Sequence, residues 1–368
     1  MLALLVLCGC ASFVGCGLLV RLGRHTARRY RDDMPQRFHV GHVPRLGGVA
    51  MLVACFIGWV WMAVAEPYLG VVNGIRFRAS EAAVWSAIVL LAGGGGVLED
   101  LIHRLRARWR LLFTISAAVV AAVAFDLRVP SLGIPALDRY WMTSPLAGVL
   151  LAILATAGLP HAFNLIDGYN GLAGMVSLIC CLALAYVALL VGDRALAAVV
   201  LALAGSTAGF LVWNYPRGLI FAGDGGAYLW GTVIAIASVV LTQRNPQVSP
   251  WFPMLLLAYP VMETVFSVYR KVVRGQSPSL ADALHLHQLI YRRIVRGVFD
   301  EDSTRRMLMR NNRTSPYLWA FAVLTVVPAA LFWQQTRVLI AFLMLFVLSY
   351  IYGYFSIVRF KVPRWLRR

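Results

Sequence analysis

Long apolar runs recur along the whole chain, with short polar segments between them. Eleven runs come close to the roughly 20 residues that a helix needs to cross a bilayer: 2–20, 46–66, 82–98, 110–125, 145–160, 172–191, 195–213, 227–242, 251–270, 317–334 and 338–358. Because such runs are too many for one soluble core, they predict an all-α polytopic membrane protein. We expect about eleven transmembrane helices with catalytic cytoplasmic loops, in a single domain over residues 1–368.

Lys and Arg are distributed unevenly between the two sets of connecting segments. With the N-terminus outside, the inside segments are 21–45, 99–110, 161–171, 214–226, 271–316 and 359–368. Together with Arg270 they hold 27 of the 34 basic residues, and the opposite loops hold seven. Cytoplasmic loops are enriched in Lys and Arg. The pattern therefore predicts an inner-membrane protein with its N-terminus outside and its C-terminus in the cytoplasm.

Composition supports a membrane protein and argues against a nucleic-acid-binding protein. The chain is 60% hydrophobic and 14% charged, whereas a soluble domain carries about 25% charged residues. The net charge of +18 suggests nucleic-acid binding, but the basic residues cluster between apolar runs, where orientation in the membrane explains them. We therefore expect membrane lipids, and no nucleic acid, as partners. The six cysteines lie inside apolar runs without a CxxC spacing, which indicates helix packing.

Carboxylates are scarce and gather on the predicted inner face. Only 16 Asp and Glu occur. Those on that face include seven that lie, for the most part, at or near helix ends: Asp32, Asp33, Glu99, Asp100, Asp167, Asp224 and Asp282. A membrane-spanning protein has no structural need for acids at several helix mouths. Together they predict a site that binds a cation or protons.

Two polar groups lie near the first and third spans. Arg37, His39 and Arg45 precede the pair Gly47-Gly48, whose backbone amides could approach a phosphate. A basic anchor loop is the alternative. Glu99-Asp100 ends the third span, and adjacent carboxylates repel, so at least one requires a cation or a proton. Ion pairs with the arginines that follow are the alternative.

The third group, Asn164-Leu-Ile-Asp167-Gly168-Tyr-Asn170-Gly171, is the most informative. Asn164 and Asp167 share a helix face, and the glycines permit a tight backbone around a ligand. Plain turns would explain Asp-Gly and Asn-Gly separately, but they would not explain an inside loop without Lys or Arg. Asn214, on the same face, is a further candidate.

The fourth group is Phe221-Ala-Gly223-Asp224-Gly225-Gly226. Asp224 could cap a helix N-terminus or bind a hard cation, and Phe221 could stack on a base or face lipid. The fifth is His285-Leu-His287-Gln288, which could bind metal or phosphate or be surface histidine; zinc would need further ligands. Carboxylate, arginine and open glycine backbone fit phosphate–magnesium chemistry.

In this order, the motifs resemble those of the polyprenyl-phosphate N-acetylhexosamine-1-phosphate transferase family. The resemblance extends from Asp33 to the Thr314-Ser315-Pro316-Tyr317 turn. It implies transfer of an N-acetylhexosamine 1-phosphate from a UDP-sugar to undecaprenyl phosphate, with release of UMP, to initiate a cell-envelope polysaccharide such as O-antigen. It also implies Mg²⁺, with Mn²⁺ as an alternative, and allows a homodimer.

The resemblance also implies roles for individual residues. Those implied to be catalytic are Glu99 and Asp100, at the polyprenyl phosphate, and Asp224. Asp224 is also implied to bind Mg²⁺, with Asp167 and Asn164. Substrate contacts are implied for Asn164, Gly168, Asn170, Phe221 (on uracil), His285 and His287. Arg37, His39, Arg45 and Asn214 are further candidates for contacts with the substrates.

The chain departs from the family pattern at five positions, which are Glu99 for Asp, Phe38 for Lys, His161 for Asn, Gln288 for His and Glu263 for Asp. These differences suggest a shifted sugar preference. The competing interpretation is a transporter of a phosphorylated or nucleotide-linked substrate, but a transporter would place ionisable groups near the midplane. A non-catalytic scaffold would not need the carboxylates.

Overall fold

The computed structural model describes residues 1–23, 43–70, 74–275, 284–295 and 302–359. Within these ranges the chain forms fourteen helices and no strand: α1 (Leu2–Leu22), α2 (Gly47–Leu69), α3 (Ala79–Ile102), α4 (Ala107–Phe125), α5 (Pro135–Trp141), α6 (Pro145–Ile166), α7 (Leu172–Leu190), α8 (Arg194–Asn214), α9 (Gly223–Arg244), α10 (Trp251–Leu256), α11 (Ala258–Val273), α12 (Leu286–Arg293), α13 (Ser303–Leu331) and α14 (Thr336–Val358). The all-α prediction is confirmed.

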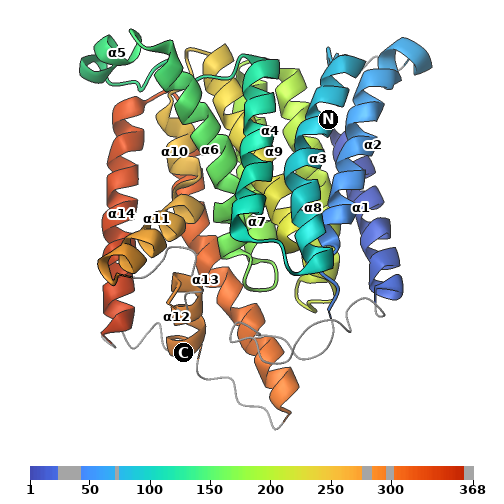
Figure 1. Cartoon of the computed structure of the whole chain (residues 1–368), viewed down its shortest axis with the longest axis vertical. Helices are drawn as coiled ribbons and strands as arrows, with labels where there is room; N and C mark the ends of the chain where they lie inside the picture. Colours follow the sequence, from blue (N-terminus) through green and yellow to red (C-terminus); the bar gives the residue numbers. More distant parts are fainter. Residues whose placement is uncertain (24–42, 71–73, 276–283, 296–301, 360–368) are drawn as a thin grey trace.

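Ten of the described helices are long and apolar enough to cross a bilayer: α1–α4, α6–α9, α13 and α14. Figure 1 shows them side by side, with α1 beginning at the upper end and α14 finishing at the lower end. The spanning stretch of α9 is buried throughout, and α9 packs against α2, α3 and α6. The chain is therefore a multi-pass membrane protein built around α9.

The predicted single helix over 251–270 is corrected to two helices, α10 and α11, joined at Leu257. Pro260 lacks a backbone N–H, and its ring clashes with the carbonyl four residues earlier. That carbonyl belongs to Leu256, where α10 ends. Figure 1 shows α10 near the upper end and α11 slanting below it. The pair still carries the chain downward, so α1 begins and α14 finishes at opposite ends.

The helix predicted over 317–334 begins earlier, because α13 starts at Ser303. Its polar first half extends below the bundle in Figure 1. Arg310 ties this half to the α12 region by donating to the carbonyls of Val295 and Tyr291, at 3.0 and 2.9 Å. Hydropathy detected only the apolar half of the helix.

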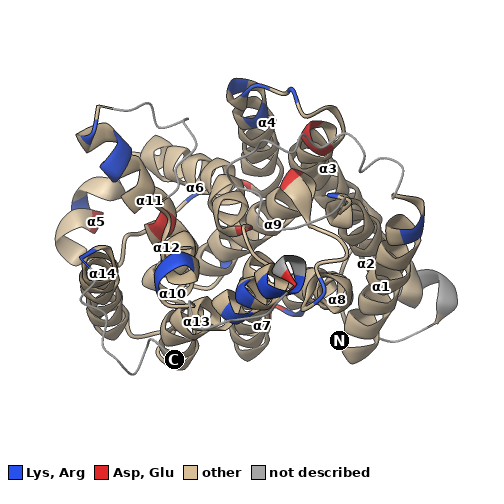
Figure 2. Cartoon of the chain, turned by 90° about the horizontal axis from the view of Figure 1, so that it is seen from below, with Lys and Arg blue, Asp and Glu red and all other residues tan. Residues whose placement is uncertain are grey.

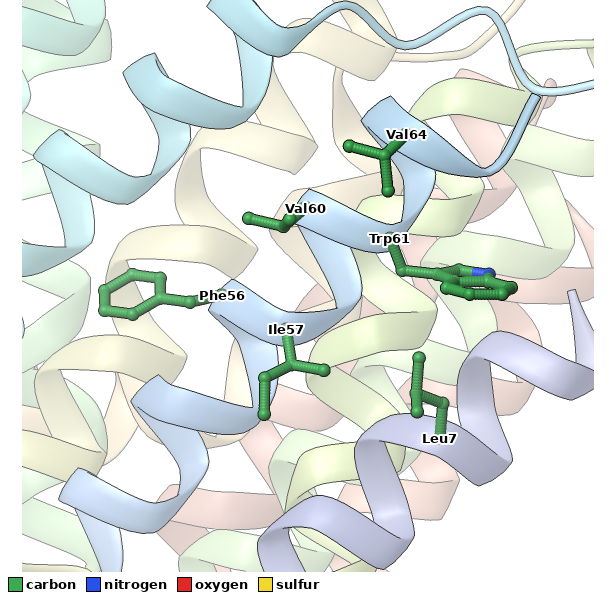
Figure 3. Close-up of a pocket in the computed structure, with 6 residues that line it drawn as sticks. All are labelled: Leu7, Phe56, Ile57, Val60, Trp61 and Val64. Atoms are coloured by element: carbon green, nitrogen blue, oxygen red, sulfur yellow. The ribbon is translucent and has the colours of Figure 1, made fainter. Parts of the chain in front are cut away.

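An apolar groove of about 400 Å³ lies between α1 and α2. Figure 3 shows the side chains around it, which are Leu7, Phe56, Ile57, Val60, Trp61 and Val64. Leu7 lies on α1, and the other five lie along the middle and upper part of α2, away from the lower ends of the helices. With no ionisable lining residue, the groove lacks the chemistry of a group-transfer site.

Candidate active site

The polar motifs singled out from the sequence meet at the lower ends of the helices, where α3 and α6 end and α9 begins. Figure 2, the view from below, shows acidic segments on α3 and beside α9, with Lys and Arg segments on α1, α4 and α13 around them. Segments far apart in sequence thus form one polar surface at one end of the bundle.

The segment before α2 runs beside the start of α9. The amides of Gly47 and Gly48 donate to the carbonyls of Phe221 and Ala222, both at 2.9 Å. These bonds place Arg45 at the mouth of α9. The suggestion that the two glycine amides contact a phosphate is therefore corrected, because both already donate to the backbone.

Asp100 of α3 caps the N-terminus of α9. Its Oδ1 and Oδ2 accept from the backbone amides of Asp224 (3.0 Å) and Gly225 (2.9 Å). The first amides of a helix lack intrahelical partners and carry partial positive charge, so a buried carboxylate is stabilised there. The sequence allowed Asp224 as the cap; the structure gives that position to Asp100.

Glycine makes this contact possible. A Cβ on Gly96 would lie 2.5 Å from the Asp224 carbonyl carbon, and one on Gly223 would overlap the Asp100 carboxylate. Gly223 also has a φ of +70°, a conformation that glycine adopts without steric cost. The glycine runs in α3 and α9 therefore let the two backbones meet at the site.

Asp224 is only 4% exposed, yet its carboxylate faces two guanidinium groups. Arg110 of α4 donates from Nη1 to Oδ2 at 2.9 Å, and Arg45 Nη2 lies 3.9 Å from Oδ1. The Tyr228 hydroxyl is 3.5 Å from Oδ2. A buried charge persists only when it is paired. This carboxylate is therefore paired with arginine at the junction of α3, α4 and α9.

A second polar layer lies one helical turn farther from the mouth. Thr114 follows Arg110 by one turn of α4, and Tyr228 follows Asp224 by one turn of α9. His161 of α6 joins them, with Nε2 at 3.1 Å from Thr114 Oγ1 and its ring edge-on to Tyr228 at a centroid distance of 5.1 Å. These contacts hold α4, α6 and α9 together one turn above the Arg110–Asp224 ion pair, on the side away from the lower ends of the helices.

Glu99 is placed differently from its neighbour Asp100. Its Oε2 accepts from the Leu105 amide at 2.7 Å and closes the turn into α4. Its other oxygen makes no hydrogen bond within the described residues, and the side chain is half-buried. Asp100 is 5% exposed, with both oxygens on α9. Of the adjacent acids, Glu99 is the more accessible to a ligand.

Asp167 follows the last residue of α6, one turn after Asn164. Burial raises the pKa of Asp167 to about 7; Arg45 opposes this rise, and Asp224 adds to it. These three charges therefore share one electrostatic site. In the described part of the chain, neither the Asn164 nor the Asp167 side chain makes a hydrogen bond, which leaves their oxygens available to a ligand.

Asn170 and Asn214 join the loops around the site. The Asn170 amide N–H donates to Asn311 Oδ1 at 2.8 Å, and its Nδ2 donates to Asn312 Oδ1 at 3.0 Å. Asn214 Oδ1 accepts from the Gly171 amide at 2.6 Å, and its Nδ2 donates to the backbone before α9 at 2.8 Å. Their contact with substrate stays a prediction, while their structural role is visible.

Buried Glu263 of α11 holds the histidine motif. Its Oε1 accepts from the Leu286 amide at 2.8 Å, its Oε2 accepts from the Tyr350 hydroxyl at 2.7 Å, and His285 Nδ1 lies 3.4 Å from Oε1. One carboxylate thus connects α11, α14 and the start of α12.

His287 reaches the loop that contains Asp167. A Cβ on Gly168 would lie 3.2 Å from His287 Nε2, and the Tyr169 ring stands edge-on to the imidazole at 5.5 Å between centroids. Burial lowers the pKa of His287 to about 3, against the opposing charge of Glu263. The imidazole is therefore neutral at pH 7. The third and fifth motifs therefore meet here.

Not every predicted site residue has a place in this geometry, and one residue of the site was not predicted. Arg37 and His39 fall outside the described residues. Phe221 is half-buried before α9, and its stacking on uracil stays a prediction. Sequence reasoning missed Arg110, which it grouped with the topology-setting arginines. The predicted span began at residue 110, whereas α4 begins at Ala107 and therefore carries Arg110 on its first turn.

Charged groups of both signs share the site, and their balance fits a divalent cation. In the described residues, no three His, Cys, Asp or Glu side chains form a closed metal centre. Mg²⁺ is usually held by one or two carboxylates, with waters and substrate phosphates completing its shell. Asp224, Asp167 and Asn164 offer oxygen donors of this kind. Four carboxylates and two guanidiniums leave a formal charge of −2: Glu99, Asp100, Asp167 and Asp224 against Arg45 and Arg110.

A helical bundle with buried carboxylates and guanidiniums paired at one end fits a membrane-embedded enzyme of phosphoryl chemistry. Residues 82–242 match the family model "Glycosyl transferase family 4". Over 69% of its length the chain is 30% identical to the probable undecaprenyl-phosphate N-acetylglucosaminyl 1-phosphate transferase of Bacillus subtilis, of which 68% is covered. The chain belongs to glycosyl transferase family 4 and is a sugar-phosphate transferase.

Two more distant relatives have similar names. The decaprenyl-phosphate N-acetylglucosaminephosphotransferase of Mycobacterium tuberculosis is 29% identical over 73% of this chain and 69% of its own length. The undecaprenyl-phosphate alpha-N-acetylglucosaminyl 1-phosphate transferase of Escherichia coli K12 is 27% identical over 90% and 84%. Similarity over most of the chain includes the segments that build the site.

Proposed function

We propose that the protein transfers an N-acetylhexosamine 1-phosphate from a UDP-sugar to undecaprenyl phosphate, giving an undecaprenyl-diphosphate sugar and UMP. The observation that carries this proposal is Asp224, a buried carboxylate between Arg45 and Arg110 at a helix mouth. The relatives support this proposal, because their names describe transfer of N-acetylglucosamine 1-phosphate to undecaprenyl or decaprenyl phosphate.

The reaction requires an oxygen of the acceptor phosphate to attack the donor phosphorus that bears the sugar. A new P–O bond forms, the bond to the bridging oxygen breaks, and UMP leaves with that oxygen. The second pKa of a phosphate monoester is about 6, so the acceptor is a nucleophile at neutral pH without a strong base. Glu99, the more accessible acid, orients the acceptor, while Asp100 fixes the helix that carries Asp224.

Arg45 and Arg110 bind the diphosphate, because guanidinium groups form paired hydrogen bonds with phosphate oxygens. Neutral His287 hydrogen-bonds to a phosphate or the sugar. Asp224, with Asp167 and Asn164, would hold Mg²⁺ or Mn²⁺, which when bound supplies positive charge to the diphosphate. A single in-line step is preferred to a phospho-aspartate, since both oxygens of Asp224 already face guanidinium groups.

The site end of the bundle faces the cytoplasm, where UDP-sugars are made, in the bacterial inner membrane. The excess of Lys and Arg on this side supports that orientation. The product would initiate a cell-envelope polysaccharide such as O-antigen.

The test uses purified protein in lipid nanodiscs with undecaprenyl phosphate, Mg²⁺ and a panel of UDP-N-acetylhexosamines. We expect UMP release that requires both the acceptor and one of the donors. Without UMP from any member of the panel, the transferase proposal fails. A transporter would instead move the labelled UDP-sugar into proteoliposomes without releasing UMP.

A further inference from the structure

Arg110 is bound to Asp224 Oδ2, a carboxylate oxygen that a cation would need as a ligand. Its Nη1 donates to Oδ2 at 2.9 Å, and the side chain is 30% exposed against 6% for Asp224. The guanidinium occupies one lone-pair direction of this oxygen, and its positive charge repels a metal cation at the same carboxylate. The described site is therefore closed by a protein cation.

The hydrogen-bonding capacity of Arg110 is mostly unused. A guanidinium has five N–H donors, and in the described part of the chain only Nη1 has an acceptor. The Nε atom is buried without a hydrogen-bond partner among the described residues. An unmet buried donor costs stability unless a ligand fills it. The free donors of Arg110 suit an acceptor with several oxygens, such as a diphosphate.

We propose that Arg110 is a movable counter-ion. It pairs with Asp224 when no divalent cation is bound, and it moves to the donor diphosphate when a cation takes Asp224. The idea rests on the proposed function, because it assumes a cation at Asp224. The departing guanidinium keeps its charge in the site, where the diphosphate pairs with it. Cation and donor binding are then coupled, since each ligand favours the same position of Arg110.

Mn²⁺ binding without substrates tests this competition directly. Mn²⁺ is titrated into the protein in nanodiscs and followed by electron paramagnetic resonance, with wild type, Arg110→Gln and Arg108→Gln. Arg108 is exposed, two residues earlier on α4, and its guanidinium lies over Trp109, so its loss removes the same charge without touching Asp224. Because a hydrogen bond to a charged group is worth about 2 kcal/mol, Arg110→Gln should bind Mn²⁺ at least about tenfold more tightly. Arg108→Gln should bind like wild type.

A second titration follows UDP as a diphosphate probe in the presence of saturating Mn²⁺. Arg110→Gln should bind UDP about tenfold more weakly, losing one charged hydrogen-bond donor, and Arg110→Lys should recover part of that affinity. Melting temperatures show that each variant is folded. Mn²⁺ affinity that stays the same or falls in Arg110→Gln overturns the counter-ion proposal.

Asp224→Asn separates this failure from failure of the metal site. If Asp224→Asn loses Mn²⁺ binding while Arg110→Gln binds as wild type does, only the counter-ion proposal is wrong. If Asp224→Asn keeps wild-type Mn²⁺ affinity, the proposed metal site is wrong, and the counter-ion proposal falls with it.

Discussion

The two sides of the site are built in different ways. On the α3–α9 side, backbones touch: Gly96 and Gly223 have no side chain, and Asp100 binds the amides that begin α9. On the α11–α12 side, side chains make the connections, with buried Glu263 linking the Leu286 amide of α12 to Tyr350. Backbone contact fixes position, whereas α12 has eight residues and depends on a few buried bonds.

This difference suggests a division of labour. The α3–α9 side sets where Asp224 lies and leaves no room for movement, which suits a group that must meet a phosphorus atom with correct geometry. The α11–α12 side holds the histidines through bonds that can open locally at smaller cost. Substitutions should therefore affect activity steeply on the first side and gradually on the second.

Gly96→Ala should have the largest effect. The new methyl group would overlap the backbone of Asp224, which cannot rotate away, so overpacking should cost about 3 kcal/mol and displace the carboxylate. UMP release should fall at least about a hundredfold, with a lower melting temperature.

Gly94→Ala is the matched control, because a Cβ there would meet nothing within 4 Å. If Gly96→Ala is as active and as stable as Gly94→Ala, the close contact between α3 and α9 is not what positions Asp224.

Glu263→Gln should have an intermediate effect. The amide replaces one acceptor oxygen by a donor beside existing donors, at a cost of about 2 kcal/mol. We expect a lower melting temperature and a KM for the UDP-sugar raised several-fold, with kcat less affected, because α12 moves while Asp224 stays. A fall in kcat as large as that of Gly96→Ala would contradict the division between the two sides.

The pH dependence of stability tests the burial of His287. Its folded-state pKa of about 3 lies below the ordinary value, near 6.5, so the unfolded chain takes up a proton first as pH falls. The contribution of His287 to the free energy of unfolding is therefore fully present above about pH 6.5 and is lost toward pH 3. Between pH 7 and 5 this loss amounts to about 2 kcal/mol.

Chemical denaturation of wild type and His287→Asn at both pH values measures this loss. The variant should lose less stability than wild type between pH 7 and 5. Equal losses in the two proteins would show that another group is responsible.

The smallest effect is expected at the joint between α13 and the α6–α7 loop. Ser315 Oγ donates to the Asn170 carbonyl at 2.6 Å, so Ser315→Ala should cost about 1 kcal/mol and lower the melting temperature slightly. Ser177, buried without a hydrogen-bond partner in the described residues, provides the control. Ser177→Ala should not destabilise the protein. An equal fall in melting temperature in both variants would show that the Ser315–Asn170 hydrogen bond does not stabilise the protein.

Hydropathy and motif order predicted most of the fold and the face that carries the site. Helix ends followed from apolar length to within about six residues, except where Pro260 interrupts a run and where the polar start of α13 is helical without being apolar. The short helices α5 and α12 were not predicted. The sequence also named Asp224, Asp167 and the His285–His287 motif. It could not predict that Asp100 caps α9 or that Arg110 pairs with Asp224, because such partners lie more than a hundred residues apart. Only packing of the helices determines which charge meets which.

The two buried acids at the start of α9, Asp100 and Asp224, provide the most direct test. Asp100→Asn and Asp224→Asn each remove one buried charge at the start of α9, and UMP release with Mg²⁺ is measured beside the melting temperature. Asp224→Asn should lose at least about a hundredfold in UMP release while remaining folded, with a lower melting temperature because Arg110 loses its charged partner. Asp100→Asn should also be less stable, because the first amides of α9 lose their charged acceptor. Wild-type UMP release by Asp224→Asn would contradict the central claim that transfer depends on this carboxylate.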